Sequence, residues 1–176
     1  MKSKRIVIDT ETTGLDPNED EILQLSVINV DDGSTIYNQY FKPERVTSWE
    51  QAQAVNGISP EIVANAPCIA DERKKINDIL CSANVIVGYN TNFDLNFLFN
   101  ANCNINPKAK VVDVMKDFAE IYGEWSEIYG DYKWQKLSTC ADYYGYDWQE
   151  DKAHDGLADC RATLFCYQQM KANNMI

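Results

Sequence analysis

The alternation of hydrophobic and polar positions over the first 41 residues predicts three strands. Residues 4–10 (KRIVIDT) form a short β-branched apolar run that ends in polar residues, which is typical of a buried strand. Residues 12–21 contain Gly14, Pro17 and Asn18 and predict a loop. Residues 22–30 and 35–41 predict two further strands, joined by a hairpin turn at Asp31-Asp32-Gly33. The chain is therefore expected to open with three antiparallel strands.

Helical and strand patterns alternate in the rest of the chain. Helices are predicted over 48–55, 59–64 and 68–81, and a short buried strand over 84–88. Asn92 is expected to cap a helix that runs to about residue 102, with Asp94 in its first turn. A last strand is predicted over 110–114, followed by helices over 134–144 and 155–171. This order predicts a single domain over residues 1–176, with a mixed sheet and helices packed on it.

Composition and charge narrow the class of protein. No apolar run approaches the ~20 residues that span a bilayer, so no membrane association is expected. Asp9 and Glu11 interrupt the apolar stretch near the start, which excludes a secretory signal. The six cysteines form no Cys-x-x-Cys pair and are expected to be reduced, mostly buried thiols of a cytoplasmic protein.

The net charge of −11 argues against a broad duplex-binding surface, because phosphate binding normally requires Lys and Arg. The net charge is compatible with a short nucleic-acid-binding site that is centred on metal ions. Two bound Mg²⁺ ions would place positive charge where a phosphate sits.

Three acidic clusters carry the candidate chemistry. Asp9 and Glu11 lie two residues apart on a strand and therefore point to the same face, where two repelling carboxylates suit a divalent cation. Asp94 opens the second cluster, and His154 and Asp159 form the third, at the start of the last helix. Each cluster alone also fits a structural role: a polar strand end for the first, and carboxylates at helix starts for the others. Their joint occurrence favours an active site.

At these positions the chain resembles a known family. Asp9-x-Glu11, Asp94 within Asn-x-Phe-Asp-x-x-x-Leu, and His154-x-x-x-x-Asp159 match the three motifs of the DEDDh branch of the DEDD exonucleases. The similarity is closest to the epsilon proofreading subunit of bacterial DNA polymerase III and its stand-alone relatives. It covers roughly residues 5–170. Asn56 and Tyr89 depart from the pattern, since many relatives carry histidine at or near these positions.

The resemblance implies a fold and a mechanism. The fold would be α/β and ribonuclease-H-like, with a five-stranded mixed sheet flanked by helices. Asp9, Glu11 and Asp159 would hold one Mg²⁺ or Mn²⁺ ion. Asp9 would bridge to a second ion that Asp94 supports. His154 would act as the general base, and the products would be nucleoside 5′-monophosphates.

Contacts to the substrate are expected close to the motifs. Thr12, Thr13 and Leu15 follow the first carboxylates, and Phe93 precedes Asp94, so these four are the candidates for holding the terminal nucleotide. Ordinary core packing is an equal alternative for Phe93. Residues 122–134 are rich in aromatic side chains and either line the path of the strand, with Lys133 and Lys136 at phosphates, or pack over the core.

The expected partner is the 3′ end of a nucleic acid, with single-stranded DNA favoured over RNA. A polymerase or repair partner stays open, although the short chain beyond the last helix favours a stand-alone role over a replisome subunit. The alternatives are an enzyme that trims RNA or degrades short oligoribonucleotides, and a non-catalytic binding module of the same fold.

Overall fold

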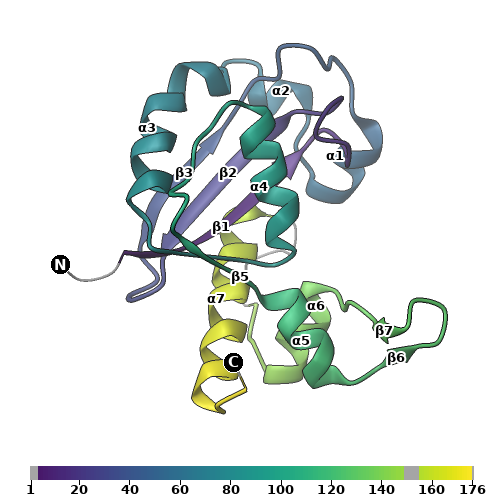
Figure 1. Ribbon diagram of the computed structural model, residues 1–176. Coiled ribbons are helices and arrows are strands. Elements are labelled where there is room, and N and C mark those ends of the chain that lie inside the picture. The colour runs from purple at the N-terminus through teal and green to yellow at the C-terminus, as the bar shows by residue number, and fades with distance from the viewer. Residues whose placement is uncertain (1–3, 149–154, 176) are drawn as a thin grey trace.

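The computed structural model describes residues 4–148 and 155–175, and its centre is a mixed sheet with helices on both faces (Figure 1). The five strands lie in the order β3-β2-β1-β4-β5. They are β1 (Arg5–Thr12), β2 (Ile22–Asn29), β3 (Thr35–Tyr40), β4 (Val85–Gly88) and β5 (Lys110–Asp113). β2 pairs antiparallel with β1 and β3, whereas β4 pairs parallel with β1 and β5. The predicted five-stranded mixed sheet is confirmed.

Seven helices surround the sheet in the described part of the chain. They are α1 (Glu50–Asn56), α2 (Pro60–Val63), α3 (Ile69–Ser82), α4 (Thr91–Asn100), α5 (Val114–Tyr122), α6 (Leu137–Tyr144) and α7 (Gly156–Ala172). A short hairpin of β6 (Trp125–Ser126) and β7 (Asp131–Tyr132) extends between α5 and α6 (Figure 1). Among the residues that the structure describes, no helix is both long and apolar enough to cross a membrane.

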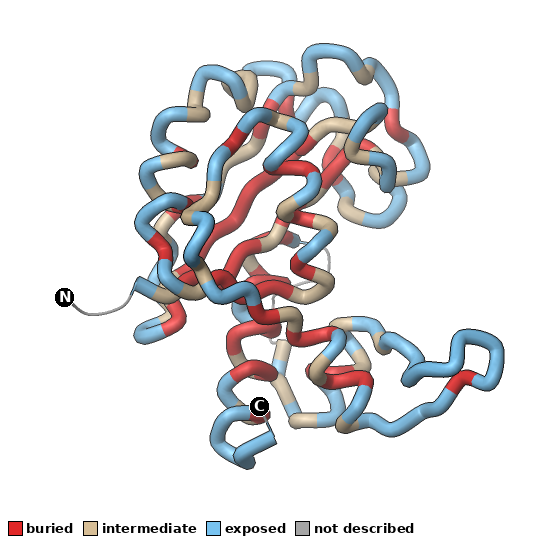
Figure 2. Tube along the Cα trace, viewed as in Figure 1, coloured by how far each residue is buried: buried red, intermediate tan, exposed pale blue. Residues whose placement is uncertain are grey.

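The two faces of β1 pack against two separate cores. Ile6 and Ile8 belong to a cluster that includes buried residues of α3 and α4. Val7 belongs to a second cluster, together with buried residues of α5, α6 and α7. Because strand side chains alternate faces, Asp9 and Glu11 continue the Val7 series and point towards α7. Figure 2 shows the resulting buried centre along the sheet.

The order of the strands also sets the place of the site. β1, β4 and β5 are parallel, so their carboxyl ends meet at one edge of the sheet. The segments that follow β4 and β5 lead directly into α4 and α5. Side chains from the end of β1 and from the starts of these helices are therefore brought to the same edge.

Some element boundaries differ from the sequence-based expectation. The expected cap Asn92 lies inside α4, which begins one residue after Asn90. The expected helix over 134–144 begins only at Leu137. α5 was not predicted, because its first buried residues, Val114 and Met115, continue straight from the strand before it and no turn signal separates them. All six cysteines are free thiols, and four of them are buried.

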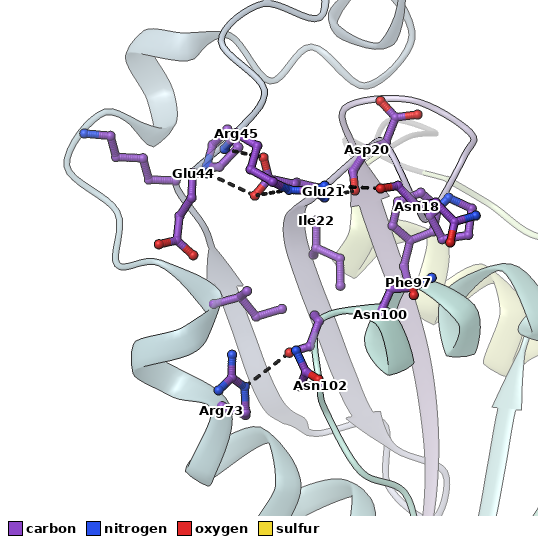
Figure 3. Close-up of a pocket in the computed structure, with 15 residues that line it drawn as sticks. Asn18, Asp20, Glu21, Ile22, Glu44, Arg45, Arg73, Phe97, Asn100 and Asn102 are labelled. Atoms are coloured by element: carbon purple, nitrogen blue, oxygen red, sulfur yellow. Dashed lines mark hydrogen bonds and ion pairs between the residues drawn. The ribbon is translucent and has the colours of Figure 1, made fainter.

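Glu21 connects the β1–β2 loop to the segment that follows β3. Its carboxylate accepts hydrogen bonds from the backbone N–H groups of Glu44, Arg45 and Val46 at 3.0, 2.7 and 2.8 Å. Figure 3 shows this contact at the rim of a pocket of about 280 Å³ between the β1–β2 loop, the start of α3 and the end of α4. Burial opposes ionisation, but the three N–H donors and Arg45 lower the pKa of Glu21 overall.

Replacing Glu21 with glutamine is expected to destabilise the protein by about 1–3 kcal/mol at neutral pH, because a neutral amide accepts these hydrogen bonds less strongly. The lowered pKa means that the stabilisation is present above the carboxyl's ordinary pKa and is lost as the pH falls through the lowered value. Urea unfolding of both proteins between pH 3 and pH 7 measures this difference. If the difference in the free energy of unfolding between the two proteins were the same at all pH values, the charge of Glu21 would not be the source of the stabilisation.

Candidate active site

Three carboxylates converge at the carboxyl end of β1. Asp9 and Glu11 come from the strand itself, and Asp159 comes from the first turn of α7. One oxygen from each side chain lies within 4.8 Å of the other two. Asp159 is buried, and Asp9 and Glu11 are partly buried. Side chains 150 residues apart in the chain thus form one acidic cluster.

The charges of this cluster oppose one another. Burial raises the pKa of Asp9 well above its ordinary value, and the neighbouring carboxylates of Asp94 and Glu11 raise it further. Burial and the charge of Asp159 raise the pKa of Glu11 to about 8. Such a group is costly to ionise without a nearby cation.

The cluster has the donor set of a divalent metal site. Oδ2 of Asp9 is buried and has no hydrogen-bond partner in the described part of the chain. Three hard carboxylate oxygens at this separation suit Mg²⁺ or Mn²⁺, which prefer oxygen ligands. A bound cation would offset the repulsion that raises the pKa values. The acidic cluster of Asp9, Glu11 and Asp159 therefore fits a metal ion.

Asp94 lies beside this cluster but outside the group of three. It is buried in the first turn of α4, and its Oδ1 accepts hydrogen bonds from the backbone N–H and the hydroxyl of Thr10, at 2.8 and 2.7 Å. Burial raises the pKa of Asp94 to about 7, and the bonds from Thr10 oppose the shift. Asp94 thus approaches the strand from the α4 side and is held in place by the residue between Asp9 and Glu11.

The start of α7 is built for a close approach to β1. Asp155 caps this helix by accepting from the backbone N–H groups of Leu157 and Ala158. A Cβ atom at Gly156 would lie 2.9 Å from Oγ of Ser26 and 3.2 Å from Oδ2 of Asp9. Gly156 therefore allows the helix start to lie against the carboxylates. His154, expected as the general base, lies outside the described residues.

Asn56 is a contributor that sequence reasoning treated only as a departure from the family pattern. Its Nδ2 donates to the backbone carbonyl of Thr12 at 3.2 Å, and its Oδ1 accepts from the N–H of Ile58. A hydrogen bond from its side chain also lowers the pKa of Glu11, against the effect of burial. Asn56 therefore ties the end of α1 to the end of β1 through a neutral donor.

Asp113 was not anticipated from the sequence. At the end of β5 it accepts through Oδ1 from the N–H of Asn90 at 3.0 Å and from the N–H of Met115 at 3.2 Å, so it caps α5. Asn90 has a left-handed backbone (φ 64°) just before α4. Asparagine adopts this conformation more readily than most residues other than glycine, and the bond from Asn90 to Asp113 supports the backbone that presents Asp94.

Replacing Asp113 with alanine is expected to cost about 0.5–2 kcal/mol of stability as a lost helix cap, and to weaken Mn²⁺ binding through the displaced start of α4. Asparagine keeps the acceptor oxygen and should restore most of both. Urea unfolding and a Mn²⁺ titration followed by Tm check this. Equal Mn²⁺ midpoints for the wild type and the alanine variant would limit Asp113 to capping α5.

The expected substrate contacts lie in different environments. Thr12 and Thr13 are buried, and their hydroxyls donate within the loop to the carbonyl of Gly14 and the carboxylate of Asp20. Leu15 is 84% exposed. Phe93 packs against Phe97, with 4.8 Å between ring centroids. Their contacts with substrate stay predictions. Of these residues, Leu15 offers the most free surface.

The chain is similar to known exonucleases. A family model described as RNase_T: Exonuclease matches residues 6–167. An Escherichia phage 186 protein, "Uncharacterized exonuclease CP81", is 32% identical over 93% of this chain and 86% of its own length. "RNA exonuclease 4" of Aspergillus fumigatus is 27% identical over 96% of this chain, which spans about half (51%) of that protein.

The fold has a counterpart among solved structures. E. coli exonuclease I in complex with a dA16 oligonucleotide superposes with a TM-score of 0.77 and 21% identity over 99% of this chain. This chain spans 42% of that protein. The likeness confirms the expected fold class.

Proposed function

The chain belongs to the RNase_T exonuclease family, and from this membership and its acidic cluster we propose that it is a metal-dependent 3′→5′ exonuclease. It removes nucleoside 5′-monophosphates from the 3′ end of single-stranded DNA. The observation that carries the proposal is the convergence of Asp9, Glu11 and Asp159, whose carboxylate oxygens lie within 4.8 Å of one another.

The proposed roles of the residues rest on the family resemblance and on the contacts of the described residues. Asp9, Glu11 and Asp159 would hold one divalent ion, and Asp94 would support a second. Bound ions would supply positive charge that stabilises the attacking and leaving oxygens of an in-line displacement. Thr10 orients Asp94 through two hydrogen bonds, and Asn56 orients the end of β1. The family resemblance makes His154, the only histidine in the chain, the general base that takes the proton of the attacking water.

DNA is proposed as the substrate over RNA. The motif Asp9-Thr-Glu-Thr-Thr-Gly favours the DNA branch of the family, and the structural relative exonuclease I was solved with a DNA oligonucleotide. The second candidate is an enzyme that trims RNA, and the 27% identity to an RNA exonuclease favours it. A binding module without activity has no physical reason to keep carboxylates that repel one another in a partly buried cluster.

Product analysis on matched DNA and RNA strands tests the proposal. Strands of one sequence, labelled at either end, are incubated with Mg²⁺, Mn²⁺ or a chelator. We expect a 5′-labelled DNA strand to shorten stepwise and a 3′-labelled strand to release a labelled mononucleotide, both only with metal. Internal fragments at early times would refute an exonuclease. Faster shortening of RNA would establish the second candidate.

A further inference from the structure

The β6–β7 hairpin and its flanks, residues 124–134, form an arm with an exposed aromatic surface. Trp125, Tyr129, Tyr132 and Trp134 are exposed by 49%, 82%, 36% and 59%. Figure 2 shows the arm exposed over almost its whole length. A two-stranded hairpin is only marginally stable by itself, and rings left in water add nothing to the core. So many exposed rings on one small hairpin indicate a binding surface.

The rings are arranged with free faces. Trp125 and Tyr132 meet edge to face across the two strands, with centroids 5.4 Å apart and planes at 86°. Both rings nevertheless remain accessible to a ligand, because both side chains are exposed. Tyr129, Tyr132 and Trp134 line one side of a hollow of about 610 Å³, together with Asp131 and Lys133. Flat rings around an open hollow suit a planar aromatic ligand.

α5 leaves the sheet from the edge that carries the acidic cluster, and its nine residues, at a rise of ~1.5 Å per residue, put the start of the arm about 14 Å from that edge. α5 begins at the carboxyl end of β5, which runs parallel to β4 and therefore in the direction of β1. The arm follows α5 and projects to one side of the fold (Figure 1). A strand whose 3′ end lies at the acidic cluster can therefore continue towards the arm.

The arm carries one lysine, Lys133, and three carboxylates, Glu124, Glu127 and Asp131, and Lys116 of α5 lies near it. Lys133 stands between Tyr132 and Trp134 in the sequence, and Nζ of Lys116 lies 5.8 Å from the centroid of the Trp134 ring. Lys133 pairs with Glu124 at 2.7 Å, but both side chains are about half exposed, so the pair is weak and a phosphate can replace its acid. With so few cations, stacking of bases on the exposed rings, rather than contact with phosphates, is the means by which the arm can hold a single strand.

The net charge of the chain favours base stacking over an extended basic surface. A net charge of −11 leaves few cations to neutralise phosphates, whereas stacking of a base on a ring does not depend on net charge. We propose that the aromatic arm binds single-stranded nucleic acid by stacking bases on the 5′ side of the end that is cleaved. This proposal rests on the proposed exonuclease function.

The test compares wild type with the double variant Tyr129→Ala/Trp134→Ala on two 20-nucleotide strands. One strand is intact, and the other has abasic sites in its 5′ half, which keep the phosphates and remove the rings. We expect the variant to raise KM for the intact strand about fivefold or more, with kcat changed less than twofold. For wild type, KM should rise by a similar factor on the abasic strand. For the variant, KM should be the same on the two strands.

Phe99→Ala is the matched control, because Phe99 is 77% exposed on α4, outside the arm. It should behave as wild type on both strands. Equal KM values for wild type and the double variant would overturn the proposal. The proposal would also be overturned if sedimentation showed wild type and Phe99→Ala as dimers and the double variant as a monomer. The arm would then bind a second copy of the chain.

Binding without cleavage separates the two proposals. If no strand is degraded, the exonuclease proposal fails. Quenching of tryptophan fluorescence by the intact strand in chelator then still tests the arm. Quenching in wild type and Phe99→Ala, with weaker binding of the double variant, would support stacking by the arm. Equal affinities for all three proteins would refute it.

Discussion

Replacing Glu11 with glutamine is expected to reduce turnover by about 100-fold or more and, at the same time, to raise the Tm of the metal-free protein. Glu11, Asp9 and Asp159 bring carboxylate oxygens within 4.8 Å of one another, so the folded state concentrates negative charge that the unfolded chain disperses. Glutamine removes one of these charges and keeps the shape. We expect Tm in chelator to rise by about 3 °C or more at pH 8.

The sign of the pH dependence follows from the raised pKa. Burial and Asp159 raise the pKa of Glu11 from 4.5 to about 8. The contribution of Glu11 to the stability of the folded form is therefore fully present below about pH 4.5 and is lost as the pH rises towards 8. The metal-free wild type should lose Tm over this window, and Glu11→Gln should lose less.

Metal ions should reverse the order of the Tm values of wild type and Glu11→Gln. Millimolar Mn²⁺ is expected to raise the Tm of the wild type, because the ion binds the folded cluster and not the unfolded chain. The variant should gain less. Glu19→Gln is the control, since Glu19 is an exposed carboxylate of the β1–β2 loop. If Glu11→Gln lowered the metal-free Tm, or if Mn²⁺ left the wild type unchanged, the cluster would not be a site that needs a cation.

Replacing His154 with alanine is expected to reduce turnover by about 10²–10⁴-fold and to leave the Mn²⁺ midpoint within about twofold. The reason is chemical: His154 is the only side chain in the sequence with an ordinary pKa near neutrality, and the family resemblance makes it the general base. Single-turnover rates and Mn²⁺ titrations of Tm measure the two effects separately.

Asp155→Asn is the control for this variant. Asparagine caps a helix as well as aspartate does, so the start of α7 is preserved and activity should stay within about threefold. An equal loss of Mn²⁺ affinity and of rate in His154→Ala would refute the role as a base. It would instead indicate that His154 helps to form the metal site.

Much of the fold could be predicted because its signals are local. The three opening strands, the hairpin turn between two of them and the last helix, with its apolar residues at core spacing, follow from patterns within a few residues. The boundaries of α4 were less accessible. Its first residue depends on Asn90 adopting a left-handed backbone that Asp113, 23 residues away, holds through a hydrogen bond.

The candidate site shows the same division. Family motifs identified Asp9, Glu11, Asp94 and Asp159, and the structure brings three of them into one cluster and places Asp94 on Thr10 beside it. Asn56, Asp113 and Gly156 were not predicted as contributors. Asn56 acts through a hydrogen bond to a residue 44 positions away, and Asp113 accepts a bond from a backbone N–H. Gly156 contributes the space left by a missing Cβ. None of these leaves a local pattern.

By itself the sequence determined the acidic character of the chain, the side-by-side placement of Asp9 and Glu11 on one strand face, and the order of the family motifs. Strand alternation and residue chemistry act within a few residues, so they can be read directly. The tertiary structure alone decided that Asp159 meets these carboxylates and that the aromatic residues of 124–134 lie exposed on an arm. Both depend on how distant segments pack, because burial and long-range repulsion exist only once the chain has folded.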